Sequence, residues 1–227
     1  NCISDKPTTR FKIVIDGNQR KLFLLARCAD ITVGDIDTDA DADACIISPV
    51  INEVSLDVIV EMSKRTSFLF LDPQGFVRKV RDDGSCYVDK TAMDLSKLKI
   101  DAMKVDREEG FALTGSHDID ALYKLPVKTG IMTINNRTLM FHNQHLYEIT
   151  SDMVDTKDST GAGDILAGAY TSVFVETNDA QWALCYGVAA AVMALRTNKI
   201  GIEKIPNRKG VEEYASVLQN SLRTLTV

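Results

Sequence analysis

The chain is poor in the residues that build disulfide frameworks and metal sites. Its 227 residues include five cysteines and three histidines. The cysteines are odd in number and scattered, and no two of them form a C-x-x-C pair, so neither a disulfide scaffold nor a structural zinc site is predicted. This use of cysteine is typical of a reducing compartment, and we expect a cytoplasmic protein.

An excess of positive charge and long apolar runs are also missing. The formal net charge is −6, which gives no electrostatic basis for non-specific binding to nucleic acid or to an anionic membrane. The three basic residues between Lys204 and Lys209 are too few for a nucleic-acid patch in an acidic chain. No apolar run approaches the roughly 20 residues that span a bilayer. We therefore expect neither nucleic acid nor a membrane as a partner.

Short apolar runs instead alternate with helical stretches. Strands are predicted at Cys45–Ser48, Phe68–Leu71 and Ala102–Val105, and Val54, Val58 and Met62 recur at helical spacing within Glu53–Lys64. This order is typical of an α/β fold with a mostly parallel sheet. Further predicted elements are a helix from Arg107 that stops at Gly115, a hairpin of Gly130–Ile134 with Thr138–Phe141, and helices at Ala162–Glu176, Asp179–Arg196 (capped by Asn178 or Asp179) and Gly210–Leu222.

A separate hairpin is predicted at the start of the chain. Phe11, Ile13 and Ile15 alternate with Lys12 and Val14, and Asp16-Gly17-Asn18 then turns the chain into a second apolar stretch. We divide the chain into residues 1–30, which hold this hairpin, and residues 31–227, which form the α/β core.

The segment from Asp158 to Asp164, Asp-Ser-Thr-Gly-Ala-Gly-Asp, opens a predicted helix. Its small residues let the backbone approach a ligand, and the first N–H groups of the helix have no partner within the helix. With the helix dipole, these N–H groups favour an anion at Gly161, Ala162 and Gly163. Asp164 is placed at the same end, where a carboxylate could deprotonate an attacking hydroxyl. The segment therefore predicts phosphoryl transfer.

Two other glycine-rich phosphate sites are excluded. A dinucleotide fingerprint G-x-G-x-x-G needs glycine at position 166, which is Leu166, and the P-loop pattern occurs nowhere in the chain. The segment does resemble the C-terminal signature D-[ST]-T-G-A-G-D of the PfkB/ribokinase-like carbohydrate kinases. The resemblance implies a three-layer α/β/α core with a small β-lid, Asp164 as the catalytic base, and Gly161, Ala162 and Gly163 as the anion hole for the γ-phosphate, with Thr160 beside the nucleotide.

A second stretch extends the resemblance. Lys104-Val105-Asp106-Arg107-Glu108-Glu109, followed by Leu113-Thr114-Gly115, is similar to the family's K-x-N-x-x-E…L-T-G segment, with Asp106 in place of asparagine. The similarity implies that Glu109 organises Mg²⁺ through water and that Asp106 lies near the phosphates of ATP. The residues alone are also consistent with acids in a helix's first turn. Asp72, after a predicted strand, resembles the family's Asp-Pro turn at the active-site edge, although Asp-Pro is also a common turn.

The nucleotide pocket is predicted from weaker matches. Thr129 and Gly130 resemble a T-x-G nucleotide loop, and Gly187, Val188 and Ala191 lie on the helix that corresponds to the adenine wall. Close packing of small side chains would explain this helix equally well.

The hairpin lies where the family has its lid, which closes over the sugar and often pairs with a second subunit, so a homodimer through the lid is implied. The family's opening strand and Gly-Gly segment have no counterpart before Asn1, and we expect the printed chain to be part of a longer one.

These observations predict an ATP- and Mg²⁺-dependent kinase that phosphorylates a hydroxyl of a sugar or polyol. Two alternatives stay open: a nucleoside or inositol kinase of the same fold, and a catalytically silent relative that binds nucleotide or sugar. The residues alone do not separate ATP from ADP as the donor.

Overall fold

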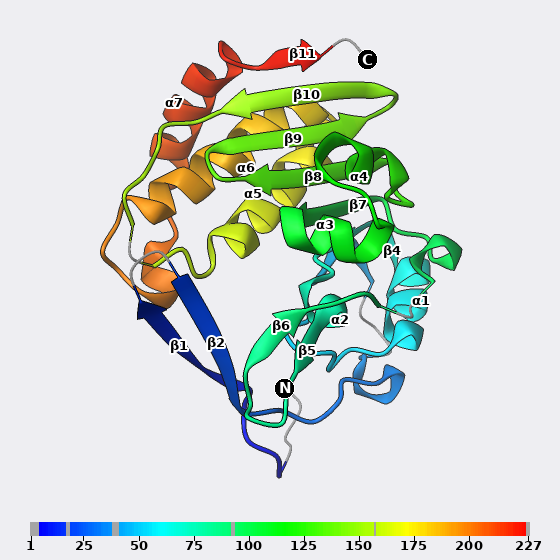
Figure 1. Ribbon diagram of the computed structural model, residues 1–227. Coiled ribbons are helices and arrows are strands. Elements are labelled where there is room, and N and C mark those ends of the chain that lie inside the picture. Colours follow the sequence, from blue (N-terminus) through cyan, green and yellow to red (C-terminus); the bar gives the residue numbers. More distant parts are fainter. Residues whose placement is uncertain (1–4, 17–18, 38–40, 92–93, 157, 226–227) are drawn as a thin grey trace.

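The centre of the molecule is a seven-stranded sheet with strand order β11-β10-β9-β8-β7-β4-β3 (Figure 1). The computed structural model describes residues 5–16, 19–37, 41–91, 94–156 and 158–225. Strands β3, β4, β7 and β8 are parallel, and β10 runs the same way because it pairs antiparallel with β9, which pairs antiparallel with β8. The mostly parallel sheet is therefore confirmed. The strands of this sheet are β3 (Ala42–Ile47), β4 (Thr66–Leu71), β7 (Ala102–Asp106), β8 (Thr129–Ile134), β9 (Arg137–His142), β10 (His145–Thr150) and β11 (Arg223–Leu225).

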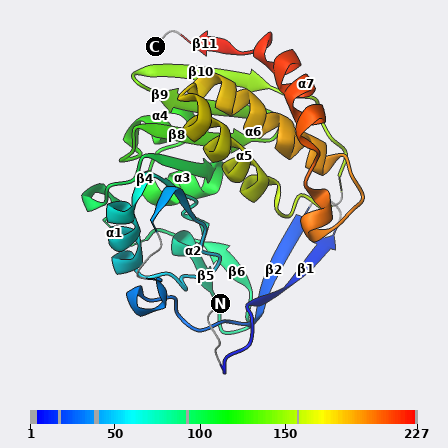
Figure 2. The ribbon, with the colours of Figure 1, turned by 180° about the vertical axis from the view of Figure 1, so that it is seen from behind.

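Helices cover both faces of the sheet, which gives the predicted three layers. One face packs against α5, α6 and α7, and the other against α1, α3 and α4 (Figures 1 and 2). The helical elements are α1 (Leu56–Arg65), α2 (Gln74–Val77), α3 (Arg107–Thr114), α4 (Asp118–Lys124), α5 (Ala162–Thr177), α6 (Ala180–Leu195) and α7 (Arg208–Gln219), with short 3₁₀ turns η1 (Val33–Asp35), η2 (Leu95–Lys97) and η3 (Gly201–Lys204).

The alternation of side chains along each strand fills the two cores. In β4, Phe70 packs into the core under α5 to α7, whereas Leu69 and Leu71 pack into the opposite core. In β7, Met103 and Val105 belong to the core under α1, α3 and α4. Lys104, between them, therefore points to the α5 side of the sheet.

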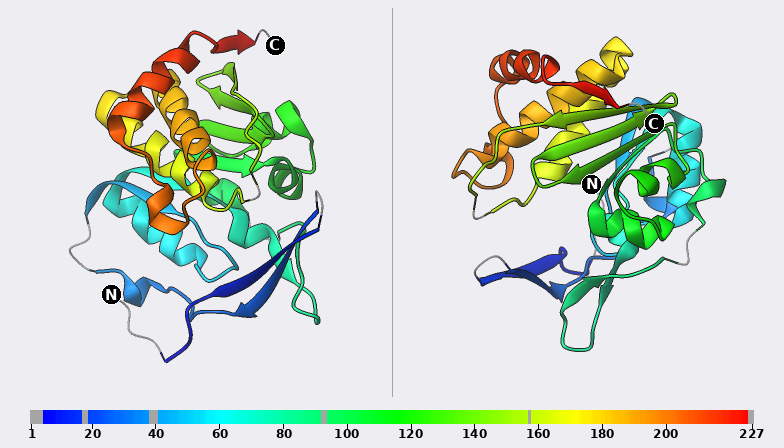
Figure 3. Two further views of the ribbon diagram at one scale, coloured as in Figure 1. Left: turned by 90° about the vertical axis from the view of Figure 1, so that its left-hand side faces the viewer. Right: turned by 45° about the horizontal axis from the view of Figure 1, so that its top comes forward.

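The N-terminal hairpin stands apart from the sheet (Figure 3). Strands β1 (Arg10–Asp16) and β2 (Gln19–Ala26) pair antiparallel, and the predicted turn at Gly17 and Asn18 lies outside the described residues. A second small hairpin, β5 (Arg78–Val80) with β6 (Cys86–Val88), supports the first, because Leu24 N donates to Gly84 O at 2.9 Å. The sequence predicts the first hairpin but not the second. The division of the chain at residue 30 stays a prediction.

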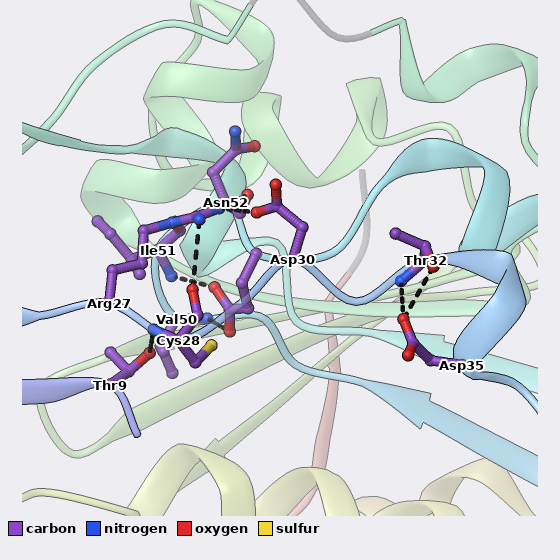
Figure 4. Close-up of polar contacts among 10 residues, drawn as sticks. Thr9, Arg27, Cys28, Asp30, Thr32, Asp35, Val50, Ile51 and Asn52 are labelled. Carbon is purple, nitrogen blue, oxygen red and sulfur yellow. Dashed lines mark hydrogen bonds and ion pairs between the residues drawn. The ribbon is translucent and has the colours of Figure 1, made fainter. Parts of the chain in front are cut away.

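Arg27 fixes the point where the hairpin joins the core (Figure 4). Its guanidinium donates to the backbone oxygens of Ile51 at 3.2 Å and Asn52 at 2.7 Å. Beside it, Cys28 N donates to Thr9 Oγ1 at 3.0 Å, which ties the two strands together at their base. The junction therefore holds the hairpin at a set angle to the sheet.

Element boundaries differ from the sequence prediction where side chains bond the backbone. Helix α1 begins at Leu56 rather than Glu53, because the buried Glu53 carboxylate accepts from Val50 N and Ile51 N and holds a turn there. Asn178 ends α5 at φ 53°, and Asp179 caps α6 by accepting from Gln181 N and Trp182 N. Within the described part of the chain, no helix is both long and apolar enough to cross a bilayer.

Candidate active site

The carboxyl ends of the parallel strands meet at one edge of the sheet, beside a cavity of about 680 Å³. Asp72 follows β4, Asp106 ends β7 and Asn135 follows β8, and all three line the cavity. In open α/β sheets this edge is where ligands bind. The first turn of α5 and one face of the β1–β2 hairpin complete the walls.

The segment from Thr160 to Gly163, here called the anion loop, has the conformation of an anion site. Gly161 is the N-cap of α5 and has φ 83°, a left-handed conformation that favours glycine. Thr160 N donates to Asp158 Oδ1 at 3.0 Å, which closes the turn that precedes Gly161. Gly161, Ala162 and Gly163 line the cavity together with Thr160. A helix of 16 residues thus begins at the cavity wall.

Gly163 leaves room for the Lys104 side chain, and its backbone conformation does not itself need glycine. A Cβ atom at this position would lie 2.8 Å from Lys104 Nζ and 3.2 Å from Lys104 Cε. The alternation of β7 brings the lysine to this place, and its ammonium donates to Asp72 Oδ2 at 2.8 Å. The first turn of α5 therefore lies directly against a buried positive charge.

Asp164 reaches the cavity from the same turn. Its Oδ1 accepts a hydrogen bond from Ser48 Oγ at 3.0 Å, and Ser48 directly follows β3. The carboxylate is exposed, so a bound hydroxyl could reach the oxygen that Ser48 leaves free. An exposed carboxylate with one free oxygen can accept a proton from a bound hydroxyl.

Three carboxylates, those of Asp72, Asp106 and Glu109, act on the Lys104 ammonium. Asp106 is the N-cap of α3: its Oδ1 accepts from Glu109 N at 2.8 Å, and Glu109 Oε2 accepts from Asp106 N at 2.7 Å. Glu109 is 4% exposed, and burial, opposed by the Lys104 ammonium and assisted by the carboxylates of Asp106 and Asp72, raises its pKa to about 7. Burial lowers the pKa of Lys104, but the carboxylates of Asp72 and Glu109 outweigh it, and the net shift is upward.

The acidic residues fit Mg²⁺ in one particular way. Among the described residues, no three His, Cys, Asp or Glu side chains are arranged to hold a metal ion on their own. Mg²⁺ commonly binds through one or two carboxylates together with water and substrate phosphates. The cavity-lining carboxylates of Asp106 and Glu109 fit that mode, whereas a site built from protein ligands alone does not fit.

The hairpin touches the anion loop directly. Arg20 of β2 donates to Thr160 Oγ1 at 3.1 Å, across 140 residues of sequence. On the same face of the hairpin, Phe11 lies under the Arg78 guanidinium, 5.6 Å from carbon to ring centroid. The register pairs Phe11 with Leu24, Ile13 with Leu22 and Ile15 with Arg20, so the predicted alternation puts these side chains on one face. The hairpin therefore covers the cavity.

The structure separates the predicted nucleotide residues into two groups. Val188 and Ala191 line the cavity with Val192 and Leu195, and they form an apolar wall beside the anion loop. Gly187 does not line it, because a Cβ there would lie 3.0 Å from Leu166 O, and the residue serves the packing of α6 on α5.

Thr129 and Gly130, which the sequence assigns to the nucleotide, do not line the cavity. They begin β8, at the edge of the sheet opposite to the cavity, and Thr129 Oγ1 is bonded to His142 Nδ1 at 2.7 Å. The other end of β8 lines the cavity instead, through Thr133, Asn135 and Asn136.

Several residues at the cavity were not identified as functional from the sequence. Lys104 had a signal, since it is a lysine within an otherwise apolar strand. Ser48, Arg20 and Arg78 had none, because each meets its partner only through long-range folding.

Comparison with known proteins identifies the family. Residues 41–207 match the model of the pfkB family of carbohydrate kinases. The chain belongs to the pfkB family. Its fold is similar to that of a pyrophosphate-dependent kinase in the ribokinase family, solved as a sulfate complex, with 24% identity, a TM-score of 0.78, and 92% of this chain and 75% of that chain covered. A ribokinase from Thermotoga maritima is 22% identical with a TM-score of 0.69, and the match covers 94% of this chain and 71% of that chain. Arabidopsis thaliana ribokinase, complexed with ribose and ATP, is 18% identical with a TM-score of 0.67, and the match covers 93% of this chain and 70% of that chain.

Membership in the pfkB family makes the chain a phosphotransferase of the kinase type. The ribokinase-like fold expected from the Asp158–Asp164 signature is confirmed.

Proposed function

We propose that this pfkB-family chain transfers the γ-phosphoryl group of ATP to a hydroxyl of a sugar or cyclic polyol. The observation that carries the proposal is the arrangement at the start of α5. Asp164, which Ser48 orients, lies one residue beyond the anion loop, and both line a cavity that the β1–β2 hairpin covers.

Asp164 takes the proton of the attacking hydroxyl. The backbone N–H groups of Gly161, Ala162 and Gly163 stabilise the charge that develops on the transferred phosphoryl group, and the nearby Lys104 ammonium adds to the positive field. Mg²⁺ would be held near Asp106 and Glu109 through water and phosphate oxygens, and it would neutralise phosphate charge. The hairpin excludes water, which otherwise competes with the acceptor.

The acceptor is assigned to the part of the cavity beneath the hairpin. Phe11, Ile13 and Leu22 offer apolar surface there, while the Arg78 guanidinium offers hydrogen-bond donors. Such a mixture suits a small polyol whose ring has apolar faces and hydroxyl edges. Similar kinases have been solved in complex with ribose and with myo-inositol.

The donor is assigned to the apolar wall. An adenine ring could pack on this wall, which is formed by Val188, Ala191, Val192 and Leu195. Pyrophosphate has no apolar group that would contact it. The competing donor is pyrophosphate, because similar solved structures are those of pyrophosphate-dependent kinases. The cationic side chains of Lys104, Arg20 and Arg78 also line the cavity and could bind its charge.

One set of assays tests both assignments. Phosphate transfer is measured with ATP, ADP or pyrophosphate, with Mg²⁺, against ribose, fructose, 2-keto-3-deoxygluconate, myo-inositol and nucleosides. ATP-dependent transfer to one acceptor that Ala191→Phe removes, by filling the apolar wall, supports the proposal. Transfer from pyrophosphate that Ala191→Phe leaves unchanged contradicts the choice of donor. Donor binding without transfer to any acceptor favours the silent relative.

The homodimer through the hairpin stays a prediction. Sedimentation of the chain and of a variant with Leu25→Lys on the hairpin tests it.

A further inference from the structure

The side chain of Lys204 is buried behind the anion loop, and the proposed reaction does not use it. The residue ends η3 and is 6% exposed, whereas Ile202 of the same turn is 81% exposed. Lys204 lies outside the set of described residues that line the cavity. A lysine that points inward from such an exposed turn must have partners for its ammonium, because burying an unpaired charge costs free energy.

All three donors of the ammonium bond to one short segment. Lys204 Nζ donates to Asp158 O at 3.2 Å, to Asp158 Oδ2 at 2.8 Å and to Thr160 O at 3.1 Å. An ammonium has three N–H donors and no acceptor, so these oxygens satisfy it completely. The pairing in turn lowers the pKa of Asp158, mainly through the hydrogen bond from Lys204 and those from Thr160.

These bonds set the direction of the peptide that leads into the anion loop. In a trans peptide the carbonyl and the N–H point in opposite directions. With Thr160 O held on Lys204, the N–H of Gly161 points to the other side of the loop. Asp158 Oδ1 meanwhile accepts from Thr160 N at 3.0 Å, so the same carboxylate links the ammonium to the turn.

We propose that the Lys204 ammonium is a built-in monovalent cation that holds the anion loop in its working shape, so that catalysis needs no free monovalent cation. Two carbonyl oxygens and one carboxylate oxygen would equally suit K⁺ or NH₄⁺, which carry the same charge and are of similar size. Lys204 is thus a positioning residue, and this inference rests on the proposed function.

Two variants separate the charge from the space that the side chain fills. Lys204→Ala removes the charge and leaves room for an ion, whereas Lys204→Met removes the charge and fills the space. Lys209→Ala, at an exposed position, is the control. Turnover is measured in KCl, NH₄Cl and tetramethylammonium chloride at one ionic strength, and so is the melting temperature.

The proposal predicts wild-type turnover that is the same in all three salts. Both variants lose roughly 10-fold or more of kcat, short of the 10²–10³ that removal of a direct oxyanion donor costs. K⁺ or NH₄⁺ restores Lys204→Ala but not Lys204→Met, and raises the melting temperature of Lys204→Ala alone.

Three results would overturn the inference: a wild type that needs K⁺, variants with unchanged kcat, or a Lys204→Ala variant that neither salt restores in activity or in melting temperature. A wild type that transfers phosphate to no acceptor contradicts the proposed function instead, and the melting temperatures still decide the inference.

Discussion

The Asp164 carboxylate accepts a hydrogen bond from the Ser48 hydroxyl at 3.0 Å, although 116 residues separate them. The bond joins the end of β3 to the first turn of α5 and occupies one oxygen of the proposed base. It therefore sets the direction in which the second oxygen faces the cavity.

Ser48→Ala should lower kcat and leave the KM of the acceptor nearly unchanged. The base keeps its charge but loses its orientation, so we expect a loss of roughly 10-fold, a part of the 10²–10⁴ that acid–base catalysis contributes. Steady-state kinetics measures the effect. The control is Ser63→Ala, because the Ser63 hydroxyl donates to Val60 O within its own helix α1. Equal kcat values in the two variants would contradict the role of Ser48.

Gly163→Ala should strongly reduce turnover while the chain stays folded. The new Cβ would lie 2.8 Å from Lys104 Nζ, so either the ammonium leaves Asp72 or the start of α5 shifts. We expect a loss of roughly 10²-fold, similar to the loss of an oxyanion donor.

Gly168→Ala in the same helix is the matched control for this substitution. Among the described residues, no atom outside the chain neighbours and the backbone of α5 itself lies within 4 Å of its added Cβ, so kcat should not change. The helix should gain up to about 1 kcal/mol because alanine has the higher helix propensity. Wild-type turnover in Gly163→Ala would show that the contact with Lys104 does not matter.

Arg20→Ala should uncouple ATP hydrolysis from phosphate transfer. The arginine joins the hairpin to Thr160 at 3.1 Å, and its loss lets water into the cavity. The ratio of ADP released to acceptor phosphorylated should rise above one, and the acceptor KM should increase. The control is Lys21→Ala, on the opposite face of the same strand, which should keep a ratio of one. A ratio of one in Arg20→Ala as well would contradict closure of the cavity by the hairpin.

Glu109 should make the stability of the fold depend on pH. Its pKa is raised to about 7, chiefly by burial, so between the ordinary value of 4.5 and pH 7 the folded state holds a proton that the unfolded state has lost. The stability that this group contributes is fully present below about pH 4.5. It is lost as the pH rises from there through about 7, and the free energy of unfolding then falls by at most about 1.4 kcal/mol per pH unit.

Glu109→Gln removes this titration but keeps an oxygen that can accept from Asp106 N. Relative to the wild type, the variant should be more stable at pH 8 than at pH 5, as measured by urea unfolding at both values. An equal difference at the two pH values would contradict the raised pKa. In the wild type, Mg²⁺-ATP affinity should increase as the pH rises through 7, because the cation favours the ionised carboxylate.

The predictable part of the site was the part that is continuous in sequence. The segment from Asp158 to Asp164 carries the glycines, the helix start and the base within seven residues, so its chemistry can be interpreted without a fold. The strands at Phe68–Leu71 and Ala102–Val105 were predicted for a similar local reason, since each is a short apolar run.

The missed residues depend on long-range contacts. Lys104 meets Gly163 only because side chains alternate along β7 and α5 crosses that face of the sheet. Thr129 and Gly130 were assigned to the nucleotide although they begin β8, and ligands bind where parallel strands end. In the sequence Lys204 is one of three neighbouring basic residues, whereas in the structure its ammonium pairs with Asp158 behind the anion loop.

The most direct test of the account is Asp164→Asn, which keeps the size of the side chain and an oxygen that can accept from Ser48 Oγ. Turnover is measured with ATP, Mg²⁺ and the best acceptor, and ATP affinity by calorimetry. The account predicts that kcat falls by roughly 10²–10⁴-fold, as expected for loss of a general base, while ATP binds almost as tightly as before. Wild-type turnover in this variant would contradict the assignment of Asp164 as the base.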